Sequence, residues 1–135
     1  MQGSIIPYGY AASNIAELEQ LMRDERTYLV DIRLSPQSRI QAFTKPMLEA
    51  RFPKHYIHMP ELGNINYRSP EQGIQIASPV RGIERLVRGI RQGYTLVLMC
   101  GCRDYESCHR RTVVELLKRA LPEVGVTMPE MESKQ

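Results

Sequence analysis

The chain has 135 residues, of which 42% are hydrophobic and 24% are charged, with a formal net charge of +3. This length and balance fit one globular domain with a single core, and they exclude a disordered chain. The small charge permits an anionic partner but does not require nucleic acid, because acidic residues are interleaved with the basic ones. No apolar run approaches the roughly 20 residues that span a bilayer, so we expect no membrane partner.

The N-terminal stretch MQGSIIPYGY lacks the basic start and the apolar core of a signal peptide. This predicts a cytoplasmic protein, in which thiols normally stay reduced. The odd count of three cysteines also argues against a disulfide framework. All three lie in one stretch, CGCRDYESCHRR, at residues 100–111.

The predicted elements alternate between strands and helices. Ser13 caps a first helix, in which Ile15 and Leu18 fall at helical spacing. Thr44 caps a short helix that ends at Phe52. The strands predicted in this half of the chain are 4–8, 27–32 and 55–59.

Residues 60–77 contain glycine, asparagine and proline with no clear period, which is typical of a binding loop or lid. Ser78 and Pro79 then open a helix that ends near Gln92. The other predicted elements are a strand at 94–100, a helix at 109–120 and a short strand at 124–128. The inward face of the last helix consists of Val113, Val114, Leu116, Leu117, Ala120 and Leu121.

Strands separated by helices predict an α/β fold: a single domain over residues 1–135, built as a three-layer αβα sandwich with a mainly parallel sheet. Ligands of such sheets bind beyond the carboxyl ends of the strands. Asp31 and Arg33 end one predicted strand, His58 ends another, and Cys100 ends the most apolar one. We therefore expect these side chains to meet at one edge of the sheet.

The cysteine stretch has three interpretations, of which the first is a metal site. Cys100, Cys102 and Cys108 with His109 or His58 offer the ligands of a Cys₃His zinc site. Their spacing differs from the paired C-x₂-C of common zinc sites, and adjacent side chains such as Cys108 and His109 rarely converge on one ion. We therefore expect no metal and no cofactor.

A reactive thiol is the second interpretation. A strand that ends in Cys100, a tight loop and a helix that starts near Cys108 form an arrangement that holds anions with backbone N–H groups. The helix end and nearby arginines lower the pKa of a thiol placed there. His109, Arg110 and Arg111 fall in the first turn, where cations oppose the helix dipole unless a negative group lies nearby. That group is an acidic side chain of the loop or a bound anion.

The third interpretation is that the cysteines simply pack, because cysteine behaves as a small hydrophobe. Cys100 at the end of an apolar strand fits packing well, and Cys102 is then an incidental loop residue. The sequence leaves all three interpretations open and favours the reactive thiol.

Arg33 and Arg39 flank the loop RLSPQSR directly after the Asp31 strand end. Two guanidinium groups and the Ser38 hydroxyl could bind a carboxylate or a phosphate. The alternative is an ion pair between Asp31 and an arginine that only holds the loop. His58 could act as a general acid or base, although a histidine at a strand end is more often a hydrogen-bonded structural group.

Three arginines, Arg81, Arg85 and Arg88, share one face of the helix that Pro79 opens. Such a stripe could contact a nucleic acid backbone. Glu84 interrupts it and no aromatic side chains accompany it, so a solvated helix face is the simpler interpretation.

Five motifs in this order resemble the domain of unknown function family 488. They are PYGYA (7–11), LVDIR (29–33), SPQSRIQAF (35–43), YIHMPELG (56–63) and LMCGCRDYESCHR (98–110). The resemblance covers about residues 4–128 and leaves 129–135 as a C-terminal tail. The family pattern implies a site made of Asp31, Arg33, Ser38, Arg39, His58, Cys100, Cys108, His109 and Arg110. The early LVDIR and the late strand-then-cysteine loop are also similar to rhodanese-like domains, by analogy.

Together these features predict a cysteine-dependent enzyme with an arginine-lined pocket for a small anionic or nucleotide-like substrate. The residues expected to act are Cys100 or Cys108 as nucleophile, His58 or His109 as proton carrier, Arg33, Arg39 and Arg110 as anion ligands, and Asp31 as the group that orients an arginine. The alternative is a non-catalytic module that binds an anion, a nucleic acid or a protein partner through the same pocket.

Overall fold

The structure is a computed structural model that describes residues 2–12, 14–102 and 105–129. Within these residues, five strands form one sheet in the order β3-β2-β4-β1-β5, and every neighbouring pair runs parallel. The strands are β1 (Ser4–Gly9), β2 (Thr27–Asp31), β3 (Tyr56–His58), β4 (Thr95–Cys100) and β5 (Gly125–Val126).

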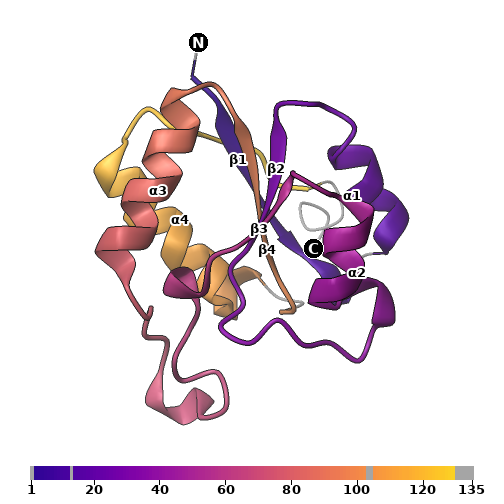
Figure 1. Cartoon of the computed structure of the whole chain (residues 1–135). Helices are drawn as coiled ribbons and strands as arrows, with labels where there is room; N and C mark the ends of the chain where they lie inside the picture. The colour runs from indigo at the N-terminus through magenta and orange to yellow at the C-terminus, as the bar shows by residue number, and fades with distance from the viewer. Residues whose placement is uncertain (1, 13, 103–104, 130–135) are drawn as a thin grey trace.

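Four α-helices of the described chain cover the two faces of this sheet (Figure 1). Helices α3 and α4 lie on one face, and α1 and α2 lie on the other. Their bounds are α1 (Ile15–Leu21), α2 (Lys45–Arg51), α3 (Pro79–Arg91) and α4 (His109–Ala120). The predicted three-layer α/β fold with a parallel sheet is therefore confirmed.

Side chains of β4 alternate between the two faces, as the pleat of a strand requires. Leu98 and Cys100 belong to the core under α3 and α4, whereas Val97 and Met99 belong to the core under α1 and α2. Cys100 therefore points toward the face on which α4 begins.

The register of the sheet aligns the carboxyl ends of its strands. Gly9 pairs with Cys100, and Asp31 pairs with both Met99 and His58. The register confirms that the strand ends at Asp31, His58 and Cys100 share one edge of the sheet, although only Cys100 of the three lines the cavity described below.

Several predicted boundaries need correction. The side chain that caps α1 belongs to Asn14, whose Oδ1 accepts a hydrogen bond from the Glu17 N–H at 3.2 Å, and Ser13 lies outside the described residues. Ala120 is exposed rather than inward, because it is the last residue of α4. The strand predicted at 124–128 is only two residues long.

Residues 63–77, which we call the arm, project from the sheet edge between β3 and α3 (Figure 1). An antiparallel bridge between Asn64 and Ile76 closes the base of the arm. The Asn64 Oδ1 atom accepts hydrogen bonds from the N–H groups of Asn66 and Gln75, both at 3.0 Å. The segment predicted as an irregular loop is thus held in a defined shape by its own hydrogen bonds.

Across the described residues, none of the helices combines the length and the apolar character needed to cross a bilayer.

Candidate functional site

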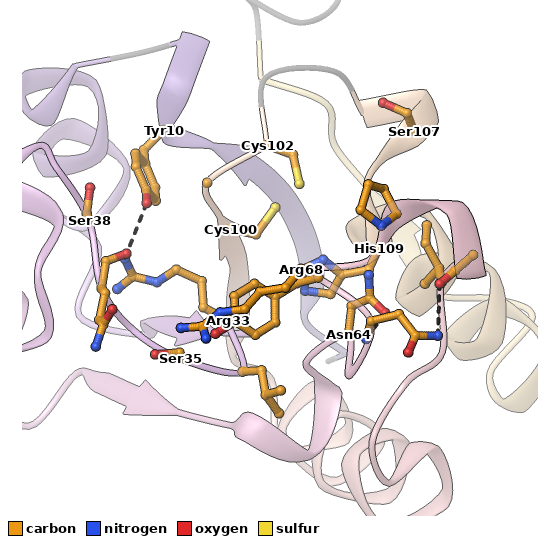
Figure 2. Close-up of a pocket in the computed structure, with 18 of the residues that line it drawn as sticks. Tyr10, Arg33, Ser35, Ser38, Asn64, Arg68, Cys100, Cys102, Ser107 and His109 are labelled. Atoms are coloured by element: carbon orange, nitrogen blue, oxygen red, sulfur yellow. Dashed lines mark hydrogen bonds between the residues drawn. The ribbon is translucent and has the colours of Figure 1, made fainter.

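A cavity of about 750 Å³ lies at the carboxyl edge of the sheet (Figure 2). Its walls come from the start of the segment after β1, the loop after β2, the arm, and the stretch between β4 and α4. The side chains that matter for its chemistry are Tyr10, Arg33, Ser38, Arg39, Asn64, Arg68, Cys100, Cys102 and His109. Four segments far apart in the sequence therefore build one pocket, at the place where ligands of parallel sheets bind.

Two of the three cysteines contribute to the cavity wall. Cys100 and Cys102 line it, and Figure 2 shows their sulfur atoms on the same side of the pocket as the His109 ring. Cys100 is buried, whereas Cys102 is half-buried. Cys108 is buried and lies outside the lining, with its Sγ 2.7 Å from the Cys100 Sγ. All three thiols are free. Because Cys102 is the least buried of them and lines the cavity, it is the thiol that a ligand in the cavity reaches most easily.

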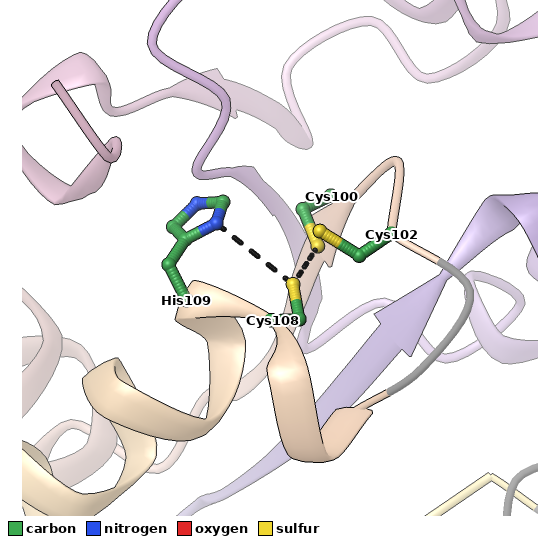
Figure 3. Close-up of side chains that lie close together, drawn as sticks. All are labelled: Cys100, Cys102, Cys108 and His109. Atoms are coloured by element: carbon green, nitrogen blue, oxygen red, sulfur yellow. Dashed lines mark hydrogen bonds between the residues drawn. The ribbon is translucent and has the colours of Figure 1, made fainter. Parts of the chain in front are cut away.

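The four side chains Cys100, Cys102, Cys108 and His109 converge on one point (Figure 3). Their potential ligand atoms all lie within 4.8 Å of one another. Adjacent Cys108 and His109 both reach this point because Cys108 is the N-cap of α4, with extended backbone, and His109 is the first helical residue. The sequence argument that neighbouring side chains rarely converge does not hold at this helix start.

A hydrogen bond to the backbone fixes the orientation of the His109 ring. Its Nε2 atom lies 2.8 Å from the carbonyl oxygen of Ile32. A carbonyl can only accept, so Nε2 carries a proton and donates it. The other ring nitrogen, Nδ1, faces the Cys108 Sγ at 3.8 Å. His109 is therefore built to offer Nδ1 to the sulfur atoms.

Arg110 supports the cluster from inside the core. Its side chain is fully buried, and both its backbone N–H and its Nε–H donate to the Cys108 Sγ at 3.4 Å. Its Nη2 also donates to the Cys102 carbonyl at 3.3 Å. A Cβ atom at Gly9 would come within 2.3 Å of that carbonyl and 2.7 Å of the Arg110 Nη1, so only glycine fits there. Arg110 thus binds the cysteine loop and does not line the cavity.

Burial and hydrogen bonds set very different pKa values within the cluster. Burial raises the pKa of the Cys100 thiol well above its ordinary value. Hydrogen bonds from Cys100 and Cys102 outweigh burial at Cys108 and lower the pKa of that thiol far below its ordinary value. Burial would lower the pKa of His109, but hydrogen bonds to Cys102 and Cys108 and the negative charge of Cys108 raise it to about 10. Of the Cys100 and Cys108 thiols, Cys108 is therefore the one whose surroundings favour the thiolate.

At the end of β2, Asp31 and Arg33 form a closed pair. The Arg33 Nε and Nη2 atoms donate to the two carboxylate oxygens of Asp31 at 2.8 and 2.6 Å. Arg33 also donates to the Phe43 carbonyl at 2.8 Å, and Tyr56 donates its hydroxyl to Asp31. Burial lowers the pKa of Arg33, but these contacts with Asp31 outweigh it and raise that pKa above its ordinary value. Arg33 therefore lines the cavity, but its charge is neutralised by the Asp31 carboxylate.

Two other arginines of the cavity wall have no such partner. Arg39 and Arg68 are both exposed and line the cavity, and no acidic side chain among the described residues pairs with either. Arg68 lies over the Tyr67 ring, 5.3 Å from its centroid. Ser38 lines the cavity too, and its Oγ accepts the Ile40 N–H at 3.0 Å. Arg39 and Arg68 are therefore the cations that remain available to a bound anion.

A family model described as "Domain of unknown function DUF488" matches residues 13–117. The chain belongs to the DUF488 family. No curated protein and no solved structure matches it. The matched residues of this DUF488 chain include every cavity-lining residue named above except Tyr10.

Other predicted site residues of the DUF488 chain lie outside the cavity. The His58 Nε2 atom donates to the Arg33 carbonyl at 2.7 Å, and the ring does not line the pocket. On α3, Arg85 pairs with Glu61 at 2.6 Å, so one arginine of the proposed nucleic acid stripe is neutralised.

Sequence reasoning missed Cys102 and Arg68 in the DUF488 chain. The sequence offers Cys102 only as a zinc ligand or, in the packing interpretation, as an incidental loop residue, and not as part of the anion pocket, yet it lines the cavity. Arg68 received no role, although the interpretation of 60–77 as a binding loop points toward it. Neither residue falls at a strand end or on a helical face, so only the folded arm and loop bring them to the site.

Proposed function

We propose that this DUF488 chain is a cysteine-dependent enzyme that acts on a small anionic or nucleotide-like substrate. One observation carries the proposal: the thiols of Cys100 and Cys102 share a cavity of about 750 Å³ with Arg39 and Arg68, two cations that pair with no acidic side chain in the described part of the chain. A pocket of this volume accommodates a small organic anion.

The cationic wall supports the choice of an anionic substrate. Guanidinium groups bind phosphate and carboxylate oxygens in pairs of parallel hydrogen bonds. Ser38 and Asn64 add polar atoms to the same cavity. The Tyr10 ring, stacked on Phe43 with centroids 4.5 Å apart, provides an aromatic part of the wall, which suits the base of a nucleotide. A phosphate ester is therefore the first substrate class to test.

Exposure favours Cys102 as the thiol that reacts, with Cys100 and Cys108 directly behind it. In the proposed step the thiol sulfur attacks the electrophilic atom of the bound anion. A bond from sulfur to that atom forms as the bond to the leaving group breaks, and the leaving group departs with the proton that the thiol gives up. Water then releases the transferred group and restores the thiol.

The test combines binding and turnover. Calorimetric titration with inorganic phosphate should show salt-sensitive binding that is about 10-fold weaker in Arg39→Ala and Arg68→Ala, as loss of one charge-assisted contact predicts. Arg91→Ala, an exposed arginine in the last turn of α3 and outside the cavity lining, is the matched control and should bind as the wild type does.

Turnover is measured with p-nitrophenyl phosphate, comparing the wild type with Cys102→Ser, Cys100→Ser and Cys108→Ser. The proposal expects Cys102→Ser to abolish turnover. Full activity in all three variants would disprove thiol chemistry. Phosphate binding without any cysteine-dependent turnover would instead support the non-catalytic binding module.

A further inference from the structure

We infer that Cys100, Cys102, Cys108 and His109 bind one divalent transition metal ion of the zinc class. This inference goes beyond the proposed enzyme and stands whether or not Cys102 attacks a substrate. It departs from the expectation drawn from the sequence, because the folded helix start places four donors where spacing alone argued against it.

The donor set has the composition of a zinc site. Three sulfur atoms and one imidazole nitrogen lie within 4.8 Å of one another. Sulfur and imidazole ligands select zinc and similar transition metals, whereas magnesium and calcium require oxygen ligands. Cys100 ends β4, Cys108 caps α4 and His109 starts it, so three donors are fixed on regular elements.

The distances require only a small adjustment. In tetrahedral zinc sites, Zn–S bonds of about 2.3 Å place neighbouring donor atoms about 3.5 to 3.8 Å apart. The Cys108 Sγ and the His109 Nδ1 are already 3.8 Å apart. The Cys100 and Cys108 sulfur atoms are 2.7 Å apart and would have to separate by about 1 Å to reach the zinc spacing. A metal ion held between them provides that separation.

Hydrogen bonds with neighbouring groups hold His109 and Cys108 in the orientation that metal binding requires. Metal-binding histidines almost always donate their other ring N–H to a carbonyl or a carboxylate. In His109, Nε2 donates to the Ile32 carbonyl at 2.8 Å, which leaves Nδ1 facing the sulfur atoms. The two N–H groups of Arg110 that point at the Cys108 Sγ suit a metal-bound thiolate equally well.

The charges also fit. Three thiolates and one divalent cation together carry one net negative charge. Burying a charge is costly unless an opposite charge accompanies it. The fully buried guanidinium of Arg110 contacts the Cys108 sulfur and so places a positive charge directly beside the thiolates.

Cys102 is the ligand closest to the cavity, since it is half-buried and lines the pocket while Cys108 does not. The metal site and the proposed anion pocket therefore share one wall. A ligand in the cavity would meet the metal-bound sulfur of Cys102 rather than the buried sulfur atoms.

The test uses Co²⁺ as a spectroscopic probe of the full chain after chelation. Titration should saturate at one equivalent, with a thiolate-to-cobalt charge-transfer band and the visible bands of tetrahedral cobalt, and Zn²⁺ should displace the cobalt. Cys102→Ser should lower the charge-transfer intensity by roughly one third, since it removes one of three sulfur ligands. It should also weaken Co²⁺ binding by more than about 10-fold.

Arg39→Ala and Arg68→Ala, at cavity residues that are not among the four metal donors, are the controls and should bind Co²⁺ as the wild type does. Because Cys100→Ser and Cys108→Ser alter buried positions, the half-buried Cys102 decides the outcome. Absence of a charge-transfer band in the wild type, or an unchanged spectrum in Cys102→Ser, would overturn the metal site. Phosphate binding, measured separately on chelated protein, distinguishes failure of the metal site from failure of the proposed enzyme.

Discussion

Arg33 and Arg110 are both buried at the same edge of the sheet, but their guanidinium groups contact different kinds of side chain. Arg33, after β2, is 6% exposed and makes a bidentate pair with the Asp31 carboxylate. Arg110, in the first turn of α4, is fully buried and directs two N–H groups at the Cys108 sulfur. The Arg33 guanidinium therefore contacts a carboxylate, and the Arg110 guanidinium contacts the sulfur of a cysteine.

This difference indicates that the Asp31–Arg33 pair has a structural role and that the thiols beside Arg110 are the reactive groups. A carboxylate that is fully engaged with Arg33 and Tyr56 has little left to offer a ligand, so this end of the edge holds the loop in place. The thiols beside Arg110 can exchange a proton for a metal ion or an electrophile. The reactive part of the cavity is therefore expected at the cysteine end of this edge rather than beside Asp31.

The largest effect is expected from breaking the scaffold pair. Asp31→Asn leaves the Arg33 charge buried without its anion, which should reduce the free energy of unfolding by about 3–5 kcal/mol. Urea denaturation followed by circular dichroism measures the change. A loss below about 1 kcal/mol, the size typical of surface pairs, would show that Asp31 and Arg33 are not a closed structural unit.

The corresponding substitution at Arg110 is expected to weaken metal binding. Arg110→Met removes the Nε–H that points at the Cys108 sulfur, and loss of such a partner typically weakens metal binding by about 10- to 100-fold. Co²⁺ titration measures the affinity, with Arg39→Met, at an exposed residue of the cavity wall, as the control. Equal affinities in Arg110→Met and the wild type would remove Arg110 from the site.

A smaller effect is expected where β1 approaches this cluster. In Gly9→Ala the new methyl group would lie 2.3 Å from the Cys102 carbonyl, and relieving that clash should cost about 1–3 kcal/mol of stability. Gly89→Ala is the matched control: its methyl group meets only Leu96 at 3.5 Å, and alanine favours the helix by about 0.5–1 kcal/mol. Thermal unfolding of both variants measures the difference. A stabilised Gly9→Ala variant would refute the close packing of β1 on the cysteine loop.

The smallest effect on stability is expected from the ion pair between Arg85 and Glu61. Burial raises the pKa of Glu61, but the hydrogen bond from Arg85 at 2.6 Å outweighs it and the pKa is lowered. The pair therefore stabilises the fold above the unfolded-state pKa of Glu61, and this contribution is lost as the pH falls through the lowered pKa. Glu61→Gln should reduce stability by less than about 1 kcal/mol near pH 7, and by nothing in acid. A difference that persists in acid would rule out the ion pair as its cause.

Much of the fold follows from the sequence because its signals are local. The apolar run of β4 and the apolar period of α4 predicted both elements, and α4 begins and ends where expected. The strand ends at Asp31 and Cys100 also pointed to the correct edge, since parallel strands align their carboxyl ends. These predictions need only periodicity and strand direction.

The site was less predictable because it depends on contacts that sequence spacing does not encode. Cys108 and His109 converge only because a helix cap separates their backbone conformations. Arg68 reaches the cavity only because the bridge between Asn64 and Ile76 folds the arm over it. That Arg33 contacts the Asp31 carboxylate and Arg110 contacts the Cys108 sulfur likewise emerges only from packing.

The accessible thiol of Cys102 shares one cavity with the available cations Arg39 and Arg68. The most direct measurement is the rate at which Cys102 reacts with iodoacetate and with iodoacetamide in chelated protein, resolved for each cysteine by mass spectrometry. Because Arg39 and Arg68 attract the anionic reagent, the ratio of the two rates should exceed that of a free cysteine peptide. The ratio should fall in Arg68→Ala and stay unchanged in Arg91→Ala. A ratio equal to that of the peptide, unaffected by Arg68→Ala, would show that Arg39 and Arg68 do not act on a ligand at Cys102.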